Sequence, residues 1–87
     1  MKLKTDGHMK YSARESRVFS LLRTQEQSTL ILCQQFYQPK RPPFHGRQII
    51  LGLLSSLARK AIANRESFRV RKSSRAGPYP ISFWVEQ

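Results

Sequence analysis

A single change of hydrophobic period, close to residue 65, most constrains what this chain can fold into. Before it, in the stretch RQIILGLLSSLARKAIAN, apolar side chains recur with the spacing of an α-helix and polar ones lie on the opposite side. After it, in SFRVRK and ISFWVEQ, apolar and polar residues alternate, which is typical of β-strands. We therefore expect a helix that begins near residue 45 or 46 and ends at Asn64, with Asn64 as its left-handed cap, followed by a two-stranded antiparallel hairpin. The inward face of this helix should be formed by Ile50, Leu53, Leu54, Leu57 and Ala61.

Two shorter helices are expected before residue 39. Ser12 and Glu15 have the spacing of a capping box, in which the serine hydroxyl accepts from the Glu15 amide and the carboxylate accepts from the Ser12 amide. The first helix should therefore begin at this point. Its core face would be formed by Val18, Leu21 and Leu22, with Phe19 at the edge.

The second helix should follow the polar stretch TQEQS, which we interpret as a connection. Ser28 or Thr29 would be its N-cap, and it should end before Pro39, which cannot continue a helix. Because the two residues after Leu30 are also apolar, a strand is an alternative. A basic, proline-rich link should then lead to the third helix. The residues expected to face inward are Leu30, Cys33, Phe36 and Tyr37.

Basic residues are in large excess and are unevenly distributed. The 87 residues include 16 Lys and Arg against 5 Asp and Glu, which gives a net charge of +11. Ten of the cationic residues lie between positions 40 and 75, where Glu66 is the one acid. An excess of this kind predicts a polyanionic partner.

The sequence contains no constellation of catalytic or metal-binding residues. Neither His8 nor His45 has a cysteine or carboxylate at ligand spacing, and there is no glycine-rich phosphate loop. We therefore expect no enzyme activity, no metal and no cofactor. The single cysteine, Cys33, predicts a small buried residue in a protein of the reducing cytoplasm. The longest apolar run is too short to span a membrane.

The length predicts one domain, from residue 10 to residue 87. Residues 1–9 have no apolar periodicity, and the sequence Gly-His-Met at their end resembles the trace that cloning leaves. We expect a flexible N-terminal arm or a cloning remnant there. A separate domain for a small-molecule effector does not fit in this length, so no effector is inferred.

From Tyr11 to Gln87, the expected order of two helices, a basic link, a third helix and a hairpin resembles the winged helix-turn-helix superfamily. The segment LSSLARKAIANRESFRVRKSSRAG…ISFWVE is similar to the end of many bacterial and phage regulators, where a helix leads into a basic strand, an Arg-Gly tip and an aromatic second strand. The resemblance implies an α+β fold, a three-helix bundle followed by a two-stranded β-wing. It also implies sequence-specific binding of double-stranded DNA by a small transcriptional regulator. The long proline-rich link departs from the short turn of that family.

In such a domain the third helix enters the major groove, and the wing contacts the backbone or the minor groove. The base-reading candidates are the outward and N-terminal residues of that helix that can form hydrogen bonds, namely His45, Arg47, Gln48, Ser55 and Arg59. The cations of the link, the helix end and the wing are expected to contact phosphates. They are Lys40, Arg41, Lys60, Arg69, Arg71, Lys72 and Arg75.

Other interpretations stay open on the sequence alone. The same fold and charge serve winged-helix modules that bind RNA or another protein. An apolar-striped basic helix is also found in membrane-active peptides. The sequence does not decide between a monomer and a homodimer.

Overall fold

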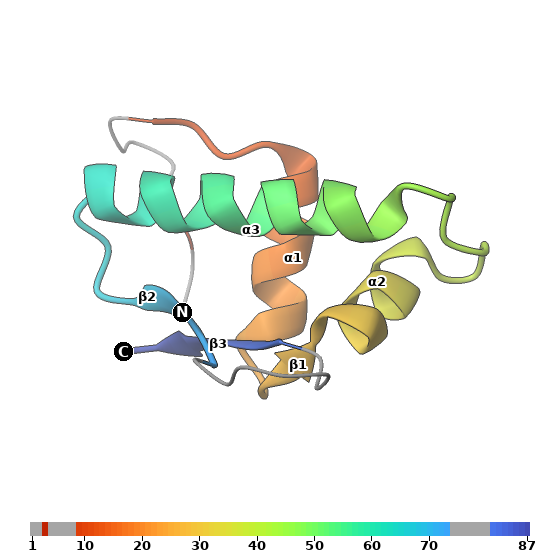
Figure 1. Ribbon diagram of the computed structural model, residues 1–87. Coiled ribbons are helices and arrows are strands. Elements are labelled where there is room, and N and C mark those ends of the chain that lie inside the picture. The colour runs from red at the N-terminus through yellow and green to blue at the C-terminus, as the bar shows by residue number, and fades with distance from the viewer. Residues whose placement is uncertain (1–2, 4–8, 74–80) are drawn as a thin grey trace.

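The computed structural model describes residue 3 and residues 9–73 and 81–87 (Figure 1). Its helices are α1 (Ala13–Leu22), α2 (Thr29–Tyr37) and α3 (Gly46–Ala63), and its strands are β1 (Gln27–Ser28), β2 (Arg69–Lys72) and β3 (Ser82–Glu86). The strands form an antiparallel sheet in the order β1-β3-β2. In Figure 1, α3 lies across α1, α2 lies beside the N-terminal end of α3, and the sheet runs below the helices. The described residues thus form the expected α+β fold, but the sheet has three strands where the sequence predicted two.

The additional strand, β1, comes from the segment predicted to be a plain connection. Gln27 pairs with Phe83 of β3. Next to it, Thr29 donates twice to the carbonyl oxygen of Ile81, from its backbone N–H at 3.1 Å and from its hydroxyl at 3.0 Å. A strand of two residues has no alternating pattern by which it could be recognised. These bonds join the start of α2 to the sheet.

The rotation of α2 about its axis differs from the prediction. Ser28 caps the helix as expected, because its hydroxyl accepts from the N–H of Ile31 at 3.3 Å. However, Leu32 is fully buried, and Leu30, predicted to face inward, is 58% exposed. The reason is that the bonds of Thr29 to Ile81, just before β3, fix the first turn, while the run of apolar residues after it fits more than one rotation. The other residues predicted to face inward are buried or half-buried: Cys33, Phe36 and Tyr37.

The predicted start of α1 is confirmed. The Ser12 hydroxyl accepts from the N–H of Glu15 at 3.1 Å, and the Ser12 N–H donates to Glu15 Oε1 at 2.7 Å. Phe19 is only 3% exposed, so its predicted position at the edge of the core is wrong. Phe68, which lies just before β2, covers its ring, and the two ring centroids are 4.8 Å apart.

The bounds, the inward face and the C-cap residue of α3 agree with the prediction, but Asn64 does not have the predicted left-handed conformation. Asn64 has a φ of −85°, and the left-handed residue is Arg65, with a φ of 54°. The N–H of Glu66 donates to Ala61 O at 3.0 Å and that of Arg65 donates to Ile62 O at 3.1 Å, which is a Schellman motif. The buried residues of the inward face are Ile50, Leu54, Leu57 and Ala61, and Leu53 is half-buried.

The side-chain amide of Asn64 forms two hydrogen bonds with the backbone of Met9. Asn64 Oδ1 accepts from Met9 N–H at 2.6 Å, and Asn64 Nδ2 donates to Met9 O at 2.7 Å. Of the arm expected at residues 1–9, only Leu3 and Met9 lie among the described residues. Both bonds hold the segment before α1 against the end of α3.

The predicted hairpin is present as β2 and β3. Val70 pairs with Val85, and the half-buried Trp84 pairs with Arg71. Phe83 is buried in the core together with residues of α1 and α3. No helix within the described ranges is long and apolar enough to cross a membrane.

Candidate nucleic-acid interface

The link between α2 and α3 projects two cations into solvent. Lys40 and Arg41 are both exposed. The N–H of Lys40 donates to Tyr37 O at 2.8 Å, so that the link begins as a turn. It ends with a second turn, in which the N–H of Gly46 donates to Pro43 O at 2.9 Å. The link therefore has a defined path although it belongs to no helix or strand.

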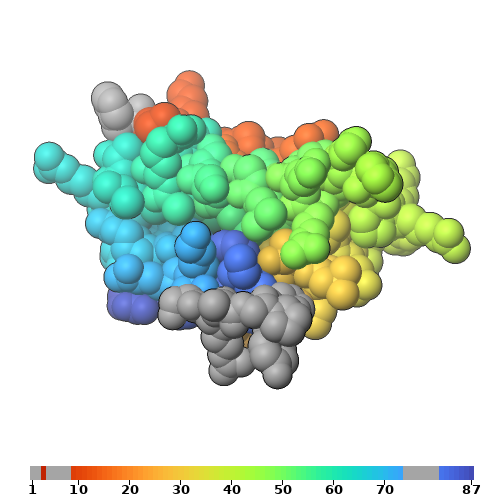
Figure 2. All heavy atoms as spheres, viewed as in Figure 1, coloured from red at the N-terminus to blue at the C-terminus, as the bar shows by residue number. Residues whose placement is uncertain are grey.

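All five base-reading candidates are exposed on α3 or at its start. His45 Nδ1 lies 3.2 Å from Gln48 Oε1, which joins these two side chains at the N-terminal end of the helix. Ser55 and Arg59 follow at spacings that keep them on the same side as Gln48. Figure 2 shows the outer side of α3 along the front of the molecule. Arg47 lies at the flank of this face.

Two glycines of α3 have opposite surroundings. A Cβ atom added to Gly46 would lie 3.2 Å from Cys33 Sγ, from Pro43 Cδ and from Tyr37 Cε2. A Cβ atom added to Gly52 would meet nothing within 4 Å. Gly46 is thus where α3 approaches α2 closely, whereas Gly52 leaves the outer face of α3 flat.

This difference predicts stability changes of opposite sign. Gly46→Ala should lower the free energy of unfolding by about 1–3 kcal/mol, because three neighbours must move. Gly52→Ala should raise it by about 0.5–1 kcal/mol, because alanine loses less backbone entropy in a helix. Urea unfolding followed by circular dichroism measures both. Equal effects of the two variants would contradict this account of how α3 packs on α2.

The cations of β2 and of the C-terminal end of α3 fall into two groups. Arg71 and Lys72 are exposed, and Arg71 Nε lies 3.6 Å from Glu86 Oε2 in an ion pair whose two partners are both exposed. Lys60 and Arg69 are half-buried and donate inside the protein. Arg69 Nη1 donates to two backbone carbonyl oxygens at 2.7 Å each. Arg75 lies outside the described residues.

Lys60 belongs to a buried polar cluster with Glu15, whose side chain is 3% exposed. Lys60 Nζ is 2.7 Å from Glu15 Oε1, and the Ser56 hydroxyl donates to Glu15 Oε2 at 2.5 Å. Burial alone would raise the pKa of Glu15. The hydrogen bonds from Lys60, Ser12 and Ser56 outweigh that effect and lower the pKa to about 2. Glu15 is therefore charged inside the protein and fixes Lys60 on the inner side of α3.

The second buried acid, Glu66, accepts from the hydroxyl of Tyr11 at 2.7 Å. Burial of the phenol and this hydrogen bond raise the pKa of Tyr11 to about 12. Because Glu66 is the one acid from residue 38 to residue 73, no carboxylate in that stretch is exposed. The electrostatic character of the link, α3 and β2 is thus positive at the surface.

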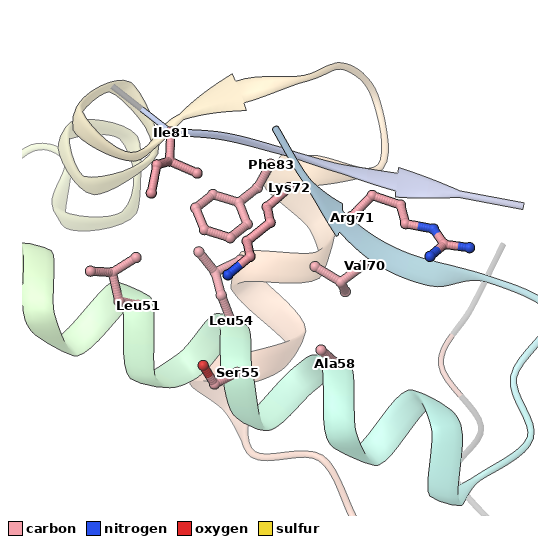
Figure 3. A pocket seen from close by; sticks show the side chains of 9 residues that line it. All are labelled: Leu51, Leu54, Ser55, Ala58, Val70, Arg71, Lys72, Ile81 and Phe83. Atoms are coloured by element: carbon pink, nitrogen blue, oxygen red, sulfur yellow. The ribbon is translucent and has the colours of Figure 1, made fainter. Parts of the chain in front are cut away.

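A groove of about 290 Å³ separates α3 from β2 and β3 (Figure 3). Lys72 extends from β2 across it toward α3, Leu51 and Ile81 face one another, and Arg71 turns away. Its remaining lining is mostly apolar: Leu54, Ser55, Ala58, Val70 and Phe83. The groove places Lys72 and Ser55 on one surface, which the sequence pattern alone did not indicate.

Sequence reasoning also missed Phe44, which is 96% exposed. Its ring lies edge-on to that of His45, with 4.9 Å between the ring centroids. A lone aromatic residue after two prolines has no period that would place it inside or outside. Only the folded link shows that it stands beside the start of α3.

No known protein family, curated protein or solved structure matches this chain. Within the described ranges, no group of three or more His, Cys, Asp or Glu side chains is arranged to hold a metal ion.

Proposed function

We propose that this chain binds double-stranded DNA sequence-specifically, as a transcriptional regulator, with α3 in the major groove and the β2–β3 hairpin on the backbone or in the minor groove. One observation carries the proposal. The outer side of α3 carries hydrogen-bonding side chains and is flanked by exposed cations from the link and from β2, with no exposed carboxylate between residues 38 and 73. Three helices with a three-stranded antiparallel sheet are also compatible with a winged helix-turn-helix domain.

The dimensions of α3 suit a major groove. Its 18 residues give a length of about 27 Å, and the groove of B-form DNA is wide enough to admit one helix. Gln48 can form a pair of hydrogen bonds with adenine, and Arg47 or Arg59 can do so with guanine. His45 and Ser55 are further donors or acceptors for base edges. The major groove of double-stranded RNA is too narrow for a helix of this kind, which favours DNA over RNA.

Phosphate contacts are assigned to cations that are exposed. Lys40 and Arg41 lie on the link before α3, and Lys72 lies at the groove beside it. The ion pair of Arg71 with Glu86 is exposed at both ends, so exchanging the carboxylate for a phosphate costs little. Lys60 and Arg69 are not assigned this role, because they donate to groups inside the protein.

Binding of a DNA duplex is expected to weaken steeply with salt. Each phosphate that a Lys or Arg neutralises releases a condensed counterion, so about four contacts give a slope of about −3 to −4 in a plot of log affinity against log salt concentration. Fluorescence anisotropy with a labelled duplex, first enriched from a random library, measures this slope. A structured RNA at equal salt serves as competitor. A slope near zero, or stronger binding of the RNA, would refute the proposal.

Two variants separate base reading from backbone contact. Gln48→Ala should cost about 1–3 kcal/mol on the enriched duplex and little on random DNA, because it removes only base-edge bonds. Lys72→Ala should weaken binding to both duplexes alike and make the slope shallower by about one. Arg14→Ala, which removes an exposed charge from α1, is the matched control and should leave the slope unchanged.

A further inference from the structure

We propose that Phe44 is a specificity-determining residue, whose ring contacts the C5-methyl group of thymine in the major groove. The inference rests on the proposed function and names a base feature that the site would select. Its starting point is that a large aromatic ring is 96% exposed beside the face of α3. An apolar side chain so fully in water gains free energy from any partner that covers it.

The backbone that carries the ring is ordered before any partner arrives. Pro42 and Pro43, which precede it, have fixed φ angles. The bond from Gly46 N–H to Pro43 O closes the turn that contains Phe44. Gly46 is itself packed against α2, because a Cβ atom added to it would lie only 3.2 Å from Cys33 Sγ. Since the backbone of the turn is already ordered, covering the ring costs side-chain entropy but little backbone entropy.

The ring also lies next to the side chains proposed to read bases. Phe44 contacts His45 edge-on, and His45 Nδ1 lies 3.2 Å from Gln48 Oε1. A DNA duplex that places a base edge on Gln48 therefore brings neighbouring base edges close to Phe44. The apolar feature on base edges in the major groove is the methyl group of thymine, and aromatic side chains are known to contact it.

The charges around Phe44 favour this partner over a second copy of the chain. Lys40, Arg41 and Arg47 lie on the same link or at the start of α3, and all three are exposed. Two copies that met through Phe44 would bring these cations together, which is unfavourable. A DNA duplex offers an apolar methyl group between two rows of phosphates. It can therefore cover the ring of Phe44 and neutralise the cations around it at the same time.

The test removes methyl groups from DNA without changing hydrogen bonds or charge. Deoxyuridine replaces thymine, one position at a time, in the enriched duplex, and affinities are measured by fluorescence anisotropy. At the contacted position the unaltered protein should bind about fourfold more weakly for each methyl group lost. Phe44→Ala should bind the thymine duplex more weakly by at least the same factor and be indifferent to deoxyuridine at that position.

Ile62→Ala is the control, because Ile62 is also exposed, at 61%, but lies near the other end of α3. It should keep the sensitivity of the unaltered protein to deoxyuridine. Thermal melts of both variants should match that of the unaltered protein, since each loses an exposed side chain.

Several results would overturn the inference. If Phe44→Ala retains the full sensitivity to deoxyuridine, or if no thymine position matters to the unaltered protein, Phe44 does not read methyl groups, while the proposed DNA binding stands. If Phe44→Ala abolishes self-association in analytical ultracentrifugation and leaves DNA affinity unchanged, a second copy covers the ring. If no duplex binds at low salt, the proposed function fails together with the inference.

Discussion

Lys60→Met is expected to lower the free energy of unfolding by about 3–5 kcal/mol, although it changes one surface-type residue in the helix proposed to contact DNA. Methionine keeps the apolar stem of the side chain and removes the ammonium group. The Glu15 carboxylate, with its side chain 3% exposed, would then be buried without its cation. Removing one partner of a buried ion pair is costly because the remaining charge is uncompensated. Lys60 would also lose its bond to Lys10 O, which is 2.8 Å long.

Urea unfolding at pH 7 measures this loss, and two further variants interpret it. Glu15→Gln combined with Lys60→Met should recover much of the stability, because a neutral amide needs no cation. Arg59→Met, an exposed neighbour on α3, should change stability by less than about 0.5 kcal/mol. A loss below about 1 kcal/mol for Lys60→Met would mean that water replaces the ammonium group.

The second large effect is a loss of stability in acid. The folded protein holds the pKa of Glu15 at about 2, below the ordinary value of 4.5. The unfolded chain therefore takes up a proton at a higher pH than the folded protein does. The contribution of Glu15 is fully present above pH 4.5 and disappears as the pH falls toward 2. A difference of this size corresponds to about 3 kcal/mol.

Urea midpoints between pH 7 and pH 2 test this prediction. The unaltered protein should lose stability mainly below pH 4.5, while Glu15→Gln should be less stable at pH 7 and change less over the same interval. Glu26→Gln, an exposed acid before β1, is the control and should leave the pH profile as it is. Identical profiles for the unaltered protein and Glu15→Gln would show that another group carries the acid sensitivity.

The parts of the fold that could be predicted are those in which a local pattern has one solution. The capping box at Ser12 fixes the start of α1 through bonds between neighbouring residues. The polar side of α3 leaves one rotation that buries Ile50 and Leu54. The alternation of apolar and polar residues in β2 and β3 likewise decides which face of the hairpin is buried.

The remaining features depend on contacts between distant parts of the chain. The rotation of α2 follows from the bonds between Thr29 and Ile81, two residues that are 52 positions apart in the sequence. Asn64 is the C-cap of α3 but not its left-handed residue, which is Arg65, and the side chain of Asn64 bonds to Met9, 55 residues away.

The residues of the candidate site also divide into those placed by a local pattern and those placed by contacts between distant parts of the chain. Exposure of Gln48, Ser55 and Arg59 follows from the period of the helix, so their positions could be predicted. Lys60 has the same charge as its neighbour Arg59, and only the tertiary contact with Glu15 removes it from the surface. The exposure of Phe44 depends on the path of a link without regular structure. Charge and period thus identify candidates, and packing decides which of them can meet a partner.

The close approach of α3 to α2 at Gly46 positions the helix, and the link is proposed to present side chains to a partner. A short turn usually combines these two roles. In this chain the position of α3 on α2 is set by a missing methyl group against Cys33 and Tyr37 of α2, and Pro43 is the link residue that packs against the same point. Residues 40–42 and Phe44, which are not among the nearest neighbours of a Cβ atom at Gly46, are therefore open to substitution, by evolution or by design, without moving the helix. Libraries that vary this link should yield folded proteins with altered site preference. The scaffold and the part proposed to select the DNA site can then change independently.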